Sequence, residues 1–143
     1  MPEKKYPRIG IGVLIENEKK EVLLGLRKGS HGEGEWCFPG GHLNFRETIF
    51  QTAKREAKEE TGLNLDNFEL ISISDDLRYI KSDGKHYVTV GVKARYKGGK
   101  VRLMEPEKCL KWQWFSLDNL PDKLLQGTEL IIRNYRAGTI YQP

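Results

Sequence analysis

The segment between Gly41 and Gly62 constrains the fold more than any other part of the chain. Residues 47 to 61 contain no glycine or proline and carry apolar side chains at helical spacing, so they predict an α-helix. Asn44, with Glu47 three residues later, predicts a capping box at the start of this helix, and Gly62 suits the residue that ends it. The fold must therefore accommodate a helix with two defined ends.

Three carboxylates share one face of that helix. Glu59 and Glu60 follow Glu56 by three and four positions, which places the three side chains within an arc of about 100°. Like charges at this spacing repel, so the helix needs either open solvent or a cation around them. The glycine loop before the helix and Arg55 beside the acids favour a cation. Hard oxygen ligands suit Mg²⁺, or Mn²⁺ in its place, and the absence of His and Cys from this face argues against zinc.

Alternating apolar residues predict β-strands in the rest of the chain. The expected strands cover residues 8–16, 21–26, 68–80, 86–97 and 112–117; the first two form a hairpin, and the third and fourth join around residues 82–84. Residues 36–38 form a short apolar run that stops at Pro39, and residues 128–137 form an amphipathic helix closed by Gly138. We therefore expect an α/β (α+β) fold, with a mixed, largely antiparallel sheet and two helices, in a single domain over residues 1–143.

Composition bounds the class of protein. Of the 143 residues, 38% are hydrophobic and 31% charged, which is typical of a globular chain rather than a disordered one. No apolar run is long enough to span a membrane and the first residues lack the apolar core of a secretory signal, so we expect no membrane partner and a cytoplasmic protein. The 24 basic and 20 acidic residues leave a formal charge of +4, only a weak hint of a phosphate-bearing ligand.

The two cysteines, Cys37 and Cys109, form no CxxC pair and cannot make a zinc site by themselves. Both stand close to aromatic residues in the sequence. We therefore expect two buried free thiols rather than a disulfide.

The residues from Gly41 to Leu63 resemble a known family. Gly41, Glu47 and then Arg55-Glu56-Ala57-Lys58-Glu59-Glu60-Thr61-Gly62-Leu63 match the fixed positions of the Nudix box, GX5EX7REUXEEXGU, in which U is aliphatic. The resemblance implies the Nudix fold, an α/β/α sandwich around a mixed sheet. It also implies hydrolysis of a nucleoside diphosphate linked to another group.

The same resemblance implies roles for individual residues. Glu56, Glu59 and Glu60 look like the carboxylates that bind metal, and the Gly40 or Gly41 carbonyl looks like a further ligand. Glu47 and Arg55 look like the pair that supports the loop and orients the acids, although Glu47 could also reach the metal through water. Glu59 or Glu60 is a candidate general base on the helix. Glu107 is a candidate outside it, because many MutT-like members carry an acid shortly before a tryptophan-bearing strand; the alternative for Glu107 is a solvated loop.

Residues outside the box are similar to the MutT-like nucleoside triphosphate pyrophosphatases. The likeness rests on Arg27-Lys28-Gly29-Ser30, on Pro39-Gly40-Gly41-His42-Leu43 and on the region from Glu105 to Trp114. It implies that Arg27 and Lys28 contact phosphates, where the alternative is a solvated strand end. It also makes His42 a candidate substrate contact, where the alternative is a structural hydrogen bond. Asn44 and Arg46 depart from the subgroup, which often carries Glu and Gly there.

Several other features have a plainer interpretation. Trp112 and Trp114 share one strand face and suit core or dimer packing better than base stacking. The basic series from Lys93 to Arg102 lacks interleaved aromatic residues, so a solvated sheet face accounts for it better than a nucleic-acid surface does. Neither His31 nor His86 has a supporting context.

We therefore expect an Mg²⁺-dependent hydrolase that converts a nucleoside triphosphate to the monophosphate and pyrophosphate through water attack at a bridging phosphate. Tyr79 stands where dinucleoside polyphosphate hydrolases of the family often carry tyrosine, which keeps those substrates and other nucleoside diphosphate derivatives as the alternative. An alternative of another class is a nucleotide sensor without hydrolysis. The family resemblance also suggests a homodimer, and no stable complex with nucleic acid is expected.

Overall fold

Strand β1 (Arg8–Glu16) lies at the centre of the sheet. The computed structural model describes residues 5–29 and 32–143 of the chain. The other strands are β2 (Glu21–Arg27), β3 (Trp36–Cys37), β4 (Gly40–His42), β5 (Glu69–Asp76), β6 (Tyr87–Arg95) and β7 (Cys109–Ser116). The main path of the sheet runs β3, β2, β1, β6, β5. Strand β4 joins it by pairing with β1, and β7 joins it by pairing with β2.

The sheet is mixed, as predicted. β1 and β6 run parallel over their whole length, from Arg8 opposite Tyr87 to Glu16 opposite Arg95. The remaining pairs of named strands are antiparallel, and they include the predicted hairpin of β1 and β2. The expectation of a largely antiparallel sheet is confirmed.

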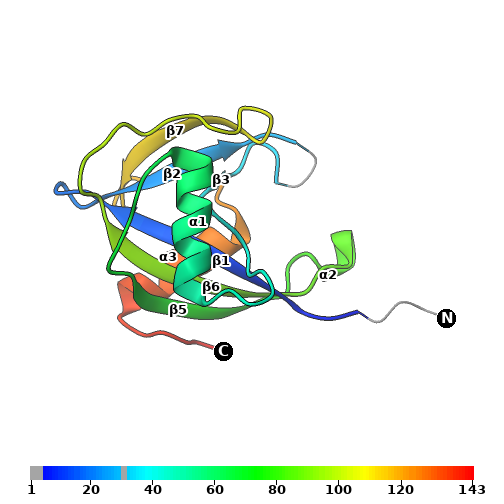
Figure 1. Cartoon of the computed structure of the whole chain (residues 1–143). Coiled ribbons are helices and arrows are strands. Elements are labelled where there is room, and N and C mark those ends of the chain that lie inside the picture. Colours follow the sequence, from blue (N-terminus) through cyan, green and yellow to red (C-terminus); the bar gives the residue numbers. More distant parts are fainter. Residues whose placement is uncertain (1–4, 30–31) are drawn as a thin grey trace.

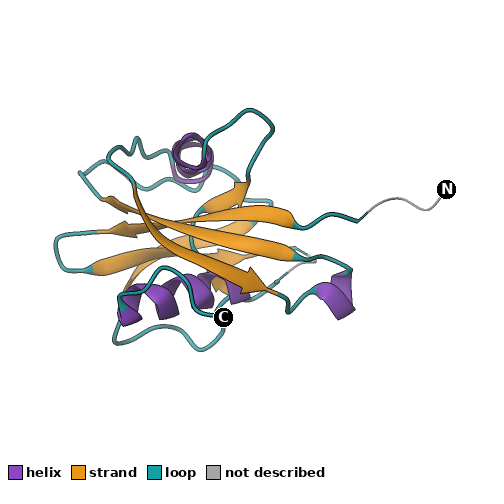
Figure 2. Ribbon diagram, turned by 90° about the horizontal axis from the view of Figure 1, so that it is seen from below, coloured by secondary structure: helices purple, strands orange, loops and turns teal. Residues whose placement is uncertain are grey.

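Helices cover both faces of the sheet. Helix α1 (Ile49–Thr61) lies on one face and helix α3 (Gln126–Ala137) on the other (Figure 1). Figure 2 shows the sheet between them, with α1 seen nearly end-on. This arrangement is the predicted α/β/α sandwich. Among the described residues, no helix has the length and apolar character needed to cross a membrane.

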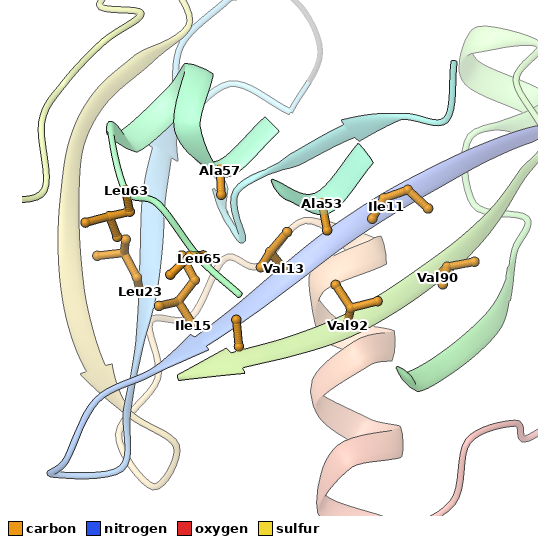
Figure 3. Close-up of a cluster of buried hydrophobic side chains, with 11 residues drawn as sticks. Ile11, Val13, Ile15, Leu23, Ala53, Ala57, Leu63, Leu65, Val90 and Val92 are labelled. Atoms are coloured by element: carbon orange, nitrogen blue, oxygen red, sulfur yellow. The ribbon is translucent and has the colours of Figure 1, made fainter. Parts of the chain in front are cut away.

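Side-chain alternation along β1 builds the core beneath α1. Ile11, Val13 and Ile15 are buried and face Ala53 and Ala57 of the helix (Figure 3). The short alanine side chains let the helix lie close to the sheet. Leucines after the helix and valines of β6 complete this cluster, among them Leu63, Leu65, Val90 and Val92.

Glycines on the opposite face let α3 approach the sheet. Gly12 and Gly91 lie opposite each other in the parallel pair. A Cβ added at Gly12 would lie 2.6 Å from Cδ1 of Ile131, and one added at Gly91 would lie 2.7 Å from its Cγ2. Ile131 of α3 is buried in the second core cluster. A larger residue at either glycine would push the helix away from the sheet.

The predicted cap of α1 is wrong by one turn. Thr48, not Asn44, caps the helix. Its hydroxyl accepts a hydrogen bond from the Gln51 N–H at 3.1 Å, and the Thr48 N–H donates to the side-chain oxygen of Gln51 at 2.9 Å. The pairs Asn44/Glu47 and Thr48/Gln51 both satisfy the capping pattern. Only a cap at Thr48 leaves Glu47 outside the helix, where it pairs with Arg55. The predicted end at Gly62 is confirmed, with φ of 77°. Arg46 adopts φ of 76°, a conformation that glycine tolerates better.

The strand predicted over residues 68–80 is too long. β5 ends at Asp76, and a short third helix, α2 (Ile80–Asp83), connects it to β6. Gly84 ends this turn with φ of 63°. The apolar side chains of Leu77 and Ile80 look strand-like in sequence, but both are exposed in this connection.

The basic series on β6 is only partly solvated. Lys93 lies on the face covered by α3, 3.4 Å from the carboxylate of Glu16 and over the ring of Tyr135. The expected solvated face is therefore wrong at this residue, because α3 packs across it. Trp112 and Trp114 pack against the core beneath α1, as the core interpretation predicts.

A buried asparagine attaches the C-terminal segment to the sheet. The side chain of Asn134 in α3 is fully buried. Its amide nitrogen lies 2.8 Å from Ser72 Oγ, 3.0 Å from Ser74 Oγ and 2.9 Å from the carbonyl oxygen of Ile140. The Asn134 amide nitrogen is therefore shared by two buried serine hydroxyls and by the carbonyl of Ile140, which also accepts from the Ile73 N–H at 2.8 Å.

We expect Asn134→Ala to lower the free energy of unfolding by about 2–4 kcal/mol, because it removes the donor that the buried hydroxyls of Ser72 and Ser74 share. Urea unfolding measures the loss, with an unchanged m-value as evidence that only stability has changed. Asn119→Ala is the matched control, since Asn119 is exposed. Equal stability of the two variants would contradict the role of Asn134.

Candidate active site

Two of the three predicted carboxylates lie under the glycine loop. Strand β4 pairs with β1 and packs against α1, so Gly40 and Gly41 lie against the helix. The Gly40 N–H donates a hydrogen bond to Oε1 of Glu60 at 2.9 Å. Glu56 lies against Gly41. The two acids therefore meet at the junction of helix and sheet.

The glycines are required by this close approach. A Cβ added at Gly41 would lie 2.4 Å from the carboxyl carbon of Glu56. A Cβ at Gly40 would lie 1.9 Å from the carbonyl oxygen of Ile11, inside the neighbouring strand. Gly41 thus makes room for a functional side chain, whereas Gly40 makes room for the backbone of β1.

Arg55 connects the loop to the acids. It forms a two-pronged pair with Glu47, with Nε to Oε2 at 2.7 Å and Nη2 to Oε1 at 2.9 Å. Its Nη1 donates to Glu56 at 2.8 Å and to Glu59 at 3.2 Å. Thr52 also donates to Glu47, at 2.9 Å. This network holds the Glu56 carboxylate in place beside Gly41.

Glu59 is placed differently from the other two acids. Its side chain is 51% exposed and bonds Arg55 one helical turn before it. It does not border the cleft that Glu56 and Glu60 line. The metal-binding and catalytic roles of Glu59 remain predictions.

The electrostatics of Glu56 and Glu60 fit a divalent cation. Burial raises the pKa of Glu60 well above its ordinary value, the charges of Glu56 and Glu105 add to this rise, and the Gly40 N–H opposes it. Crowded, partly buried carboxylates of this kind are stabilised in the charged form by a cation. Within residues 5–29 and 32–143, no three His, Cys, Asp or Glu side chains already form a metal-binding cluster. Backbone carbonyls, water and substrate phosphates would complete the ligand set, as is usual for Mg²⁺.

A cleft of about 580 Å³ opens above these acids. It brings together the predicted Glu56, Glu60, Gly40, Gly41, Glu107, Arg27, Lys28 and His42. Glu107 and Lys28 are exposed at its rim. The cleft thus combines an acidic floor with basic groups that can meet phosphate charge.

The sequence did not predict several residues that line the cleft, and three of these carry charged or aromatic side chains. Glu105 and Lys108 border the cleft and lie 3.8 Å apart as an ion pair. Trp112 borders it too, and its indole nitrogen is buried with no hydrogen-bond partner among the described residues. The two-residue spacing of Glu105 and Glu107 was the available signal for Glu105. Nothing in the sequence indicated that the tryptophan would reach the cleft.

His42 stands between the cleft and a second, smaller pocket of about 160 Å³. Its ring stacks on Tyr87, with centroids 5.7 Å apart. Burial lowers the pKa of His42, and the charges of Arg8 and Lys85 lower it further, which favours a neutral ring near pH 7. Tyr79 lines the second pocket rather than the cleft, and its hydroxyl accepts from the Gln126 N–H at 3.3 Å.

The cysteines are free and buried, as expected. Burial raises the pKa of Cys37 to about 11, although Arg27 opposes this by donating to the sulfur at 3.7 Å. A thiol with so high a pKa is a poor nucleophile. His86 borders neither the cleft nor the smaller pocket. Ser30 and His31 lie outside the described residues.

The Glu47–Arg55 pair predicts a particular pH dependence. Arg55 holds the pKa of Glu47 at about 2, below its ordinary value of 4.5. A carboxylate with a lowered pKa stabilises the folded state above the ordinary value, and this stabilisation is lost as the pH falls through the folded value. We therefore expect the difference in melting temperature between wild type and Glu47→Gln to narrow as the pH falls from about 5 to about 2.

The Glu47→Gln variant should also lower kcat, by about 10- to 100-fold, as is usual when a residue that orients a metal ligand is replaced. Thermal unfolding over the pH series and steady-state rates at neutral pH measure the two effects. A melting difference that stays constant over this range would contradict the ionic role of Glu47.

Comparison with known proteins places this site in a family. The profile of the NUDIX domain matches residues 6–135. The crystal structure of a MutT NUDIX hydrolase from Burkholderia pseudomallei is 30% identical with a TM-score of 0.84, over 91% of this chain and 98% of that one. A MutT protein from Methanosarcina mazei Go1 is 25% identical with a TM-score of 0.74, over 95% and 99% of the two chains.

A curated relative extends the comparison. The NAD-capped RNA hydrolase NudC of Stutzerimonas stutzeri (strain A1501) is 28% identical over an alignment of 119 residues, and the match covers 81% of this chain and 40% of that protein. The chain thus spans less than half the length of this relative. Two of the three relatives are named as hydrolases, which supports the expected enzyme class. Because the NUDIX profile covers most of the chain and the fold agrees, the chain belongs to the NUDIX domain family.

Proposed function

We propose that this chain hydrolyses a nucleoside triphosphate, whether normal, modified or deoxy, to the monophosphate and pyrophosphate. The observation that carries this assignment is the pairing of the partly buried Glu56 and Glu60 with a basic rim in one cleft. Acids that can hold cations and basic groups that can meet phosphates are the two requirements of phosphoryl transfer to water. The adjoining smaller pocket offers space for the rest of a nucleotide.

We assign the metal to Glu56, Glu59 and Glu60, with the carbonyl of Gly40 or Gly41 as a further ligand. Bound Mg²⁺, or Mn²⁺ in its place, would neutralise phosphate charge and acidify a water molecule. Arg55 and Glu47 orient Glu56 through the hydrogen bonds described above. Glu59 connects to the same network through Arg55.

The remaining roles concern the attacking water and the substrate. Glu59, Glu60 and Glu107 are the candidates for the group that takes the proton from the water attacking the bridging phosphate. Arg27 and Lys28 meet the phosphates, and His42 contacts the substrate between the cleft and the smaller pocket. Glu105 adds negative charge to the acidic floor.

One observation favours the alternative substrates. Tyr79 lies in the wall of the smaller pocket, and a tyrosine there could contact the second nucleoside of a dinucleoside polyphosphate or another nucleoside diphosphate derivative. Its hydroxyl already accepts a hydrogen bond from the start of α3, which gives it a structural role as well. We therefore rank these substrates second.

A substrate panel tests the assignment. We expect purified protein with Mg²⁺ to release monophosphate and pyrophosphate from at least one NTP or dNTP faster than it cleaves Ap4A, ADP-ribose or a nucleotide sugar. Chromatography of the products separates these reactions, and EDTA is the control for metal dependence. Equal or faster cleavage of Ap4A would promote the second substrate class. Nucleotide binding with no turnover of any compound would indicate a sensor.

Three further expectations belong to this proposal. We treat residues 1–143 as one Nudix domain acting in the cytoplasm. We also propose a homodimer that forms no stable complex with nucleic acid. Light scattering tests the dimer, and a monomeric mass across the working concentration range would contradict the proposed homodimer.

A further inference from the structure

His42 marks the place where the catalytic cleft meets the smaller pocket, because its side chain lines both. A nucleotide whose phosphates lie over Glu56 and Glu60, and whose other end enters the smaller pocket, has its sugar beside this ring. The groups that surround His42 therefore decide what the sugar of a substrate can carry.

Strand pairing brings the start of β1 to His42. Gly10 lies opposite His42 in the antiparallel pair of β1 and β4, and Arg8 lies opposite Tyr87 in the parallel pair of β1 and β6. The Tyr87 ring lies over Gly10, since a Cβ added there would be 3.9 Å from its Cδ1, and it stacks on the His42 ring. Side chains two positions apart on a strand share a face. Arg8 therefore projects from the same face of the sheet as these two rings.

The segment between α2 and β6 adds further basic side chains at this place. The Arg8 N–H donates to the carbonyl oxygen of His86 at 2.8 Å, which places the preceding residue, Lys85, beside the start of β1. Lys5 is close as well, since its Nζ lies 3.9 Å from a Cβ added at Gly84. The N-terminal segment and α2 lie at the same end of the sheet (Figures 1 and 2). We call Lys5, Arg8 and Lys85 the basic strip.

The basic strip keeps its positive charge close to the substrate path. Arg8 and Lys85 both lower the pKa of His42 and Glu56 raises it, so this ring lies within electrostatic reach of the strip and of the acidic floor. Within the described part of the chain, neither Arg8 nor Lys85 forms an ion pair. Residues 77–86 carry three basic residues and one acidic residue. This end of the sheet is therefore suited to an anion.

We propose that the basic strip binds a phosphate ester carried on the 3′ oxygen of the substrate's sugar. The inference rests on the proposed function, because it takes the cleft as the site of the 5′ phosphates. The 5′ carbon of the sugar leads to those phosphates and the 1′ carbon leads to the base, so the hydroxyl edge is what remains to face the strip. Guanidinium and ammonium groups bind phosphate through charge-assisted hydrogen bonds.

Two kinds of substrate present such a phosphate. One is a nucleotide with a free 3′-phosphate, which carries up to two negative charges. The other is the 5′ end of an RNA chain, in which the first phosphodiester carries one negative charge. An RNA end would bind as a substrate that leaves after cleavage, without forming a stable complex. The 3′-phosphate ester is the chemistry that both share.

Equilibrium binding of nucleotides that contain no anhydride tests the strip without turnover. Adenosine 5′-monophosphate and adenosine 3′,5′-bisphosphate differ only in the phosphate concerned. We expect calorimetry with Mg²⁺ at low salt to give the bisphosphate a Kd about 10- to 100-fold lower than that of the monophosphate. This advantage should shrink as KCl is raised from about 50 mM to about 500 mM. Equal Kd values at low salt would overturn the proposal.

Variants of the strip provide the second test. The double variant Arg8→Gln, Lys85→Gln should abolish the advantage of the bisphosphate and leave the Kd of the monophosphate unchanged, whereas a general loss of structure would weaken both ligands alike. Arg95→Gln is the matched control, because Arg95 is exposed at the other end of β6, opposite Glu16. It should retain the wild-type advantage. An equal loss in Arg95→Gln would show that overall charge attracts the ligand, and would overturn the role of the strip.

The dinucleotide pApA distinguishes the two sources of the phosphate. It carries the 3′ ester with one negative charge fewer than the bisphosphate and continues the chain by one nucleoside. Binding at least as tight as that of the bisphosphate would identify the 5′ end of RNA as the ligand, because further contacts would then replace the lost charge. Weaker binding would identify a nucleotide with a free 3′-phosphate.

These measurements separate the strip from the proposed reaction. Tighter binding of the bisphosphate without hydrolysis of any NTP would retain the basic strip as a phosphate site and reject the reaction. Hydrolysis of an NTP together with equal Kd values for the two adenosine ligands would retain the reaction and reject the phosphate site.

Discussion

Glu60→Gln is expected to lower kcat by about 10²- to 10⁴-fold while the protein stays folded. Glutamine fills the same space, and its amide oxygen can still accept the hydrogen bond from the Gly40 N–H. The change removes a crowded, poorly solvated acid beside Glu56 and Glu105, so the melting temperature should be unchanged or higher. The substrate found most active in the panel serves for the rate measurement, and thermal unfolding serves for stability.

Two companion variants make this result specific. Glu129→Gln removes the same charge from an exposed position on α3 and should leave kcat unchanged. Glu59→Gln tests whether the more exposed acid also acts on the metal, and we expect a loss of orders of magnitude there too. Near-normal rates in both Glu59→Gln and Glu60→Gln would reject the metal assignment.

Gly41→Ala is expected to lower kcat by about 100-fold, because a displacement of about 1 Å at a catalytic group is enough for such a loss. The added Cβ would lie 2.4 Å from the carboxyl carbon of Glu56, so the carboxylate must move. The φ of Gly41 is not in the left-handed region, and alanine is therefore compatible with the backbone. Rates and circular dichroism measured together distinguish lost activity from lost structure.

A double-mutant cycle tests the mechanism of that loss. If Gly41→Ala acts through Glu56, adding it to Glu56→Gln should cost little more activity than Glu56→Gln alone. Gly40→Ala provides the contrast, since its Cβ would lie 1.9 Å from the Ile11 carbonyl oxygen and should lower stability rather than only rate. Additive losses in the cycle would show that Gly41→Ala acts through something other than Glu56.

Local patterns predicted the helix and most strands well. The helix end at Gly62, the span of β1 and the hairpin with β2 follow from residues close together in sequence. The start of α1 was missed because Asn44 and Thr48 both fit the capping pattern. The choice between them depends on Glu47 pairing with Arg55, which only becomes visible once the loop folds back along the helix.

The site residues also fall into two groups, those that local spacing predicts and those that only the folded chain brings to the site. The spacing of Glu56 and Glu60 on one helical face is a local property, so the sequence indicated that they lie together. Glu105 and Trp112 reach the cleft because β7 pairs with β2 and carries the preceding loop over the acids. Asp76 reaches the smaller pocket because β5 ends beside the first turn of α3. The spacing of Glu105 and Glu107 is a local signal for Glu105, but no pattern near Trp112 or Asp76 reports such contacts.

Residue spacing alone predicts the family, the helix with its end at Gly62 and the carboxylates on it, because helical geometry converts spacing along the chain directly into a shared face. The folded chain is needed to show which acids line the cleft and which side chains surround them. The physical reason is that those features come from contacts between strands far apart in the chain. Among these are the parallel pairing of β1 with β6 and the packing of α3 over Gly12 and Gly91, which no local spacing specifies.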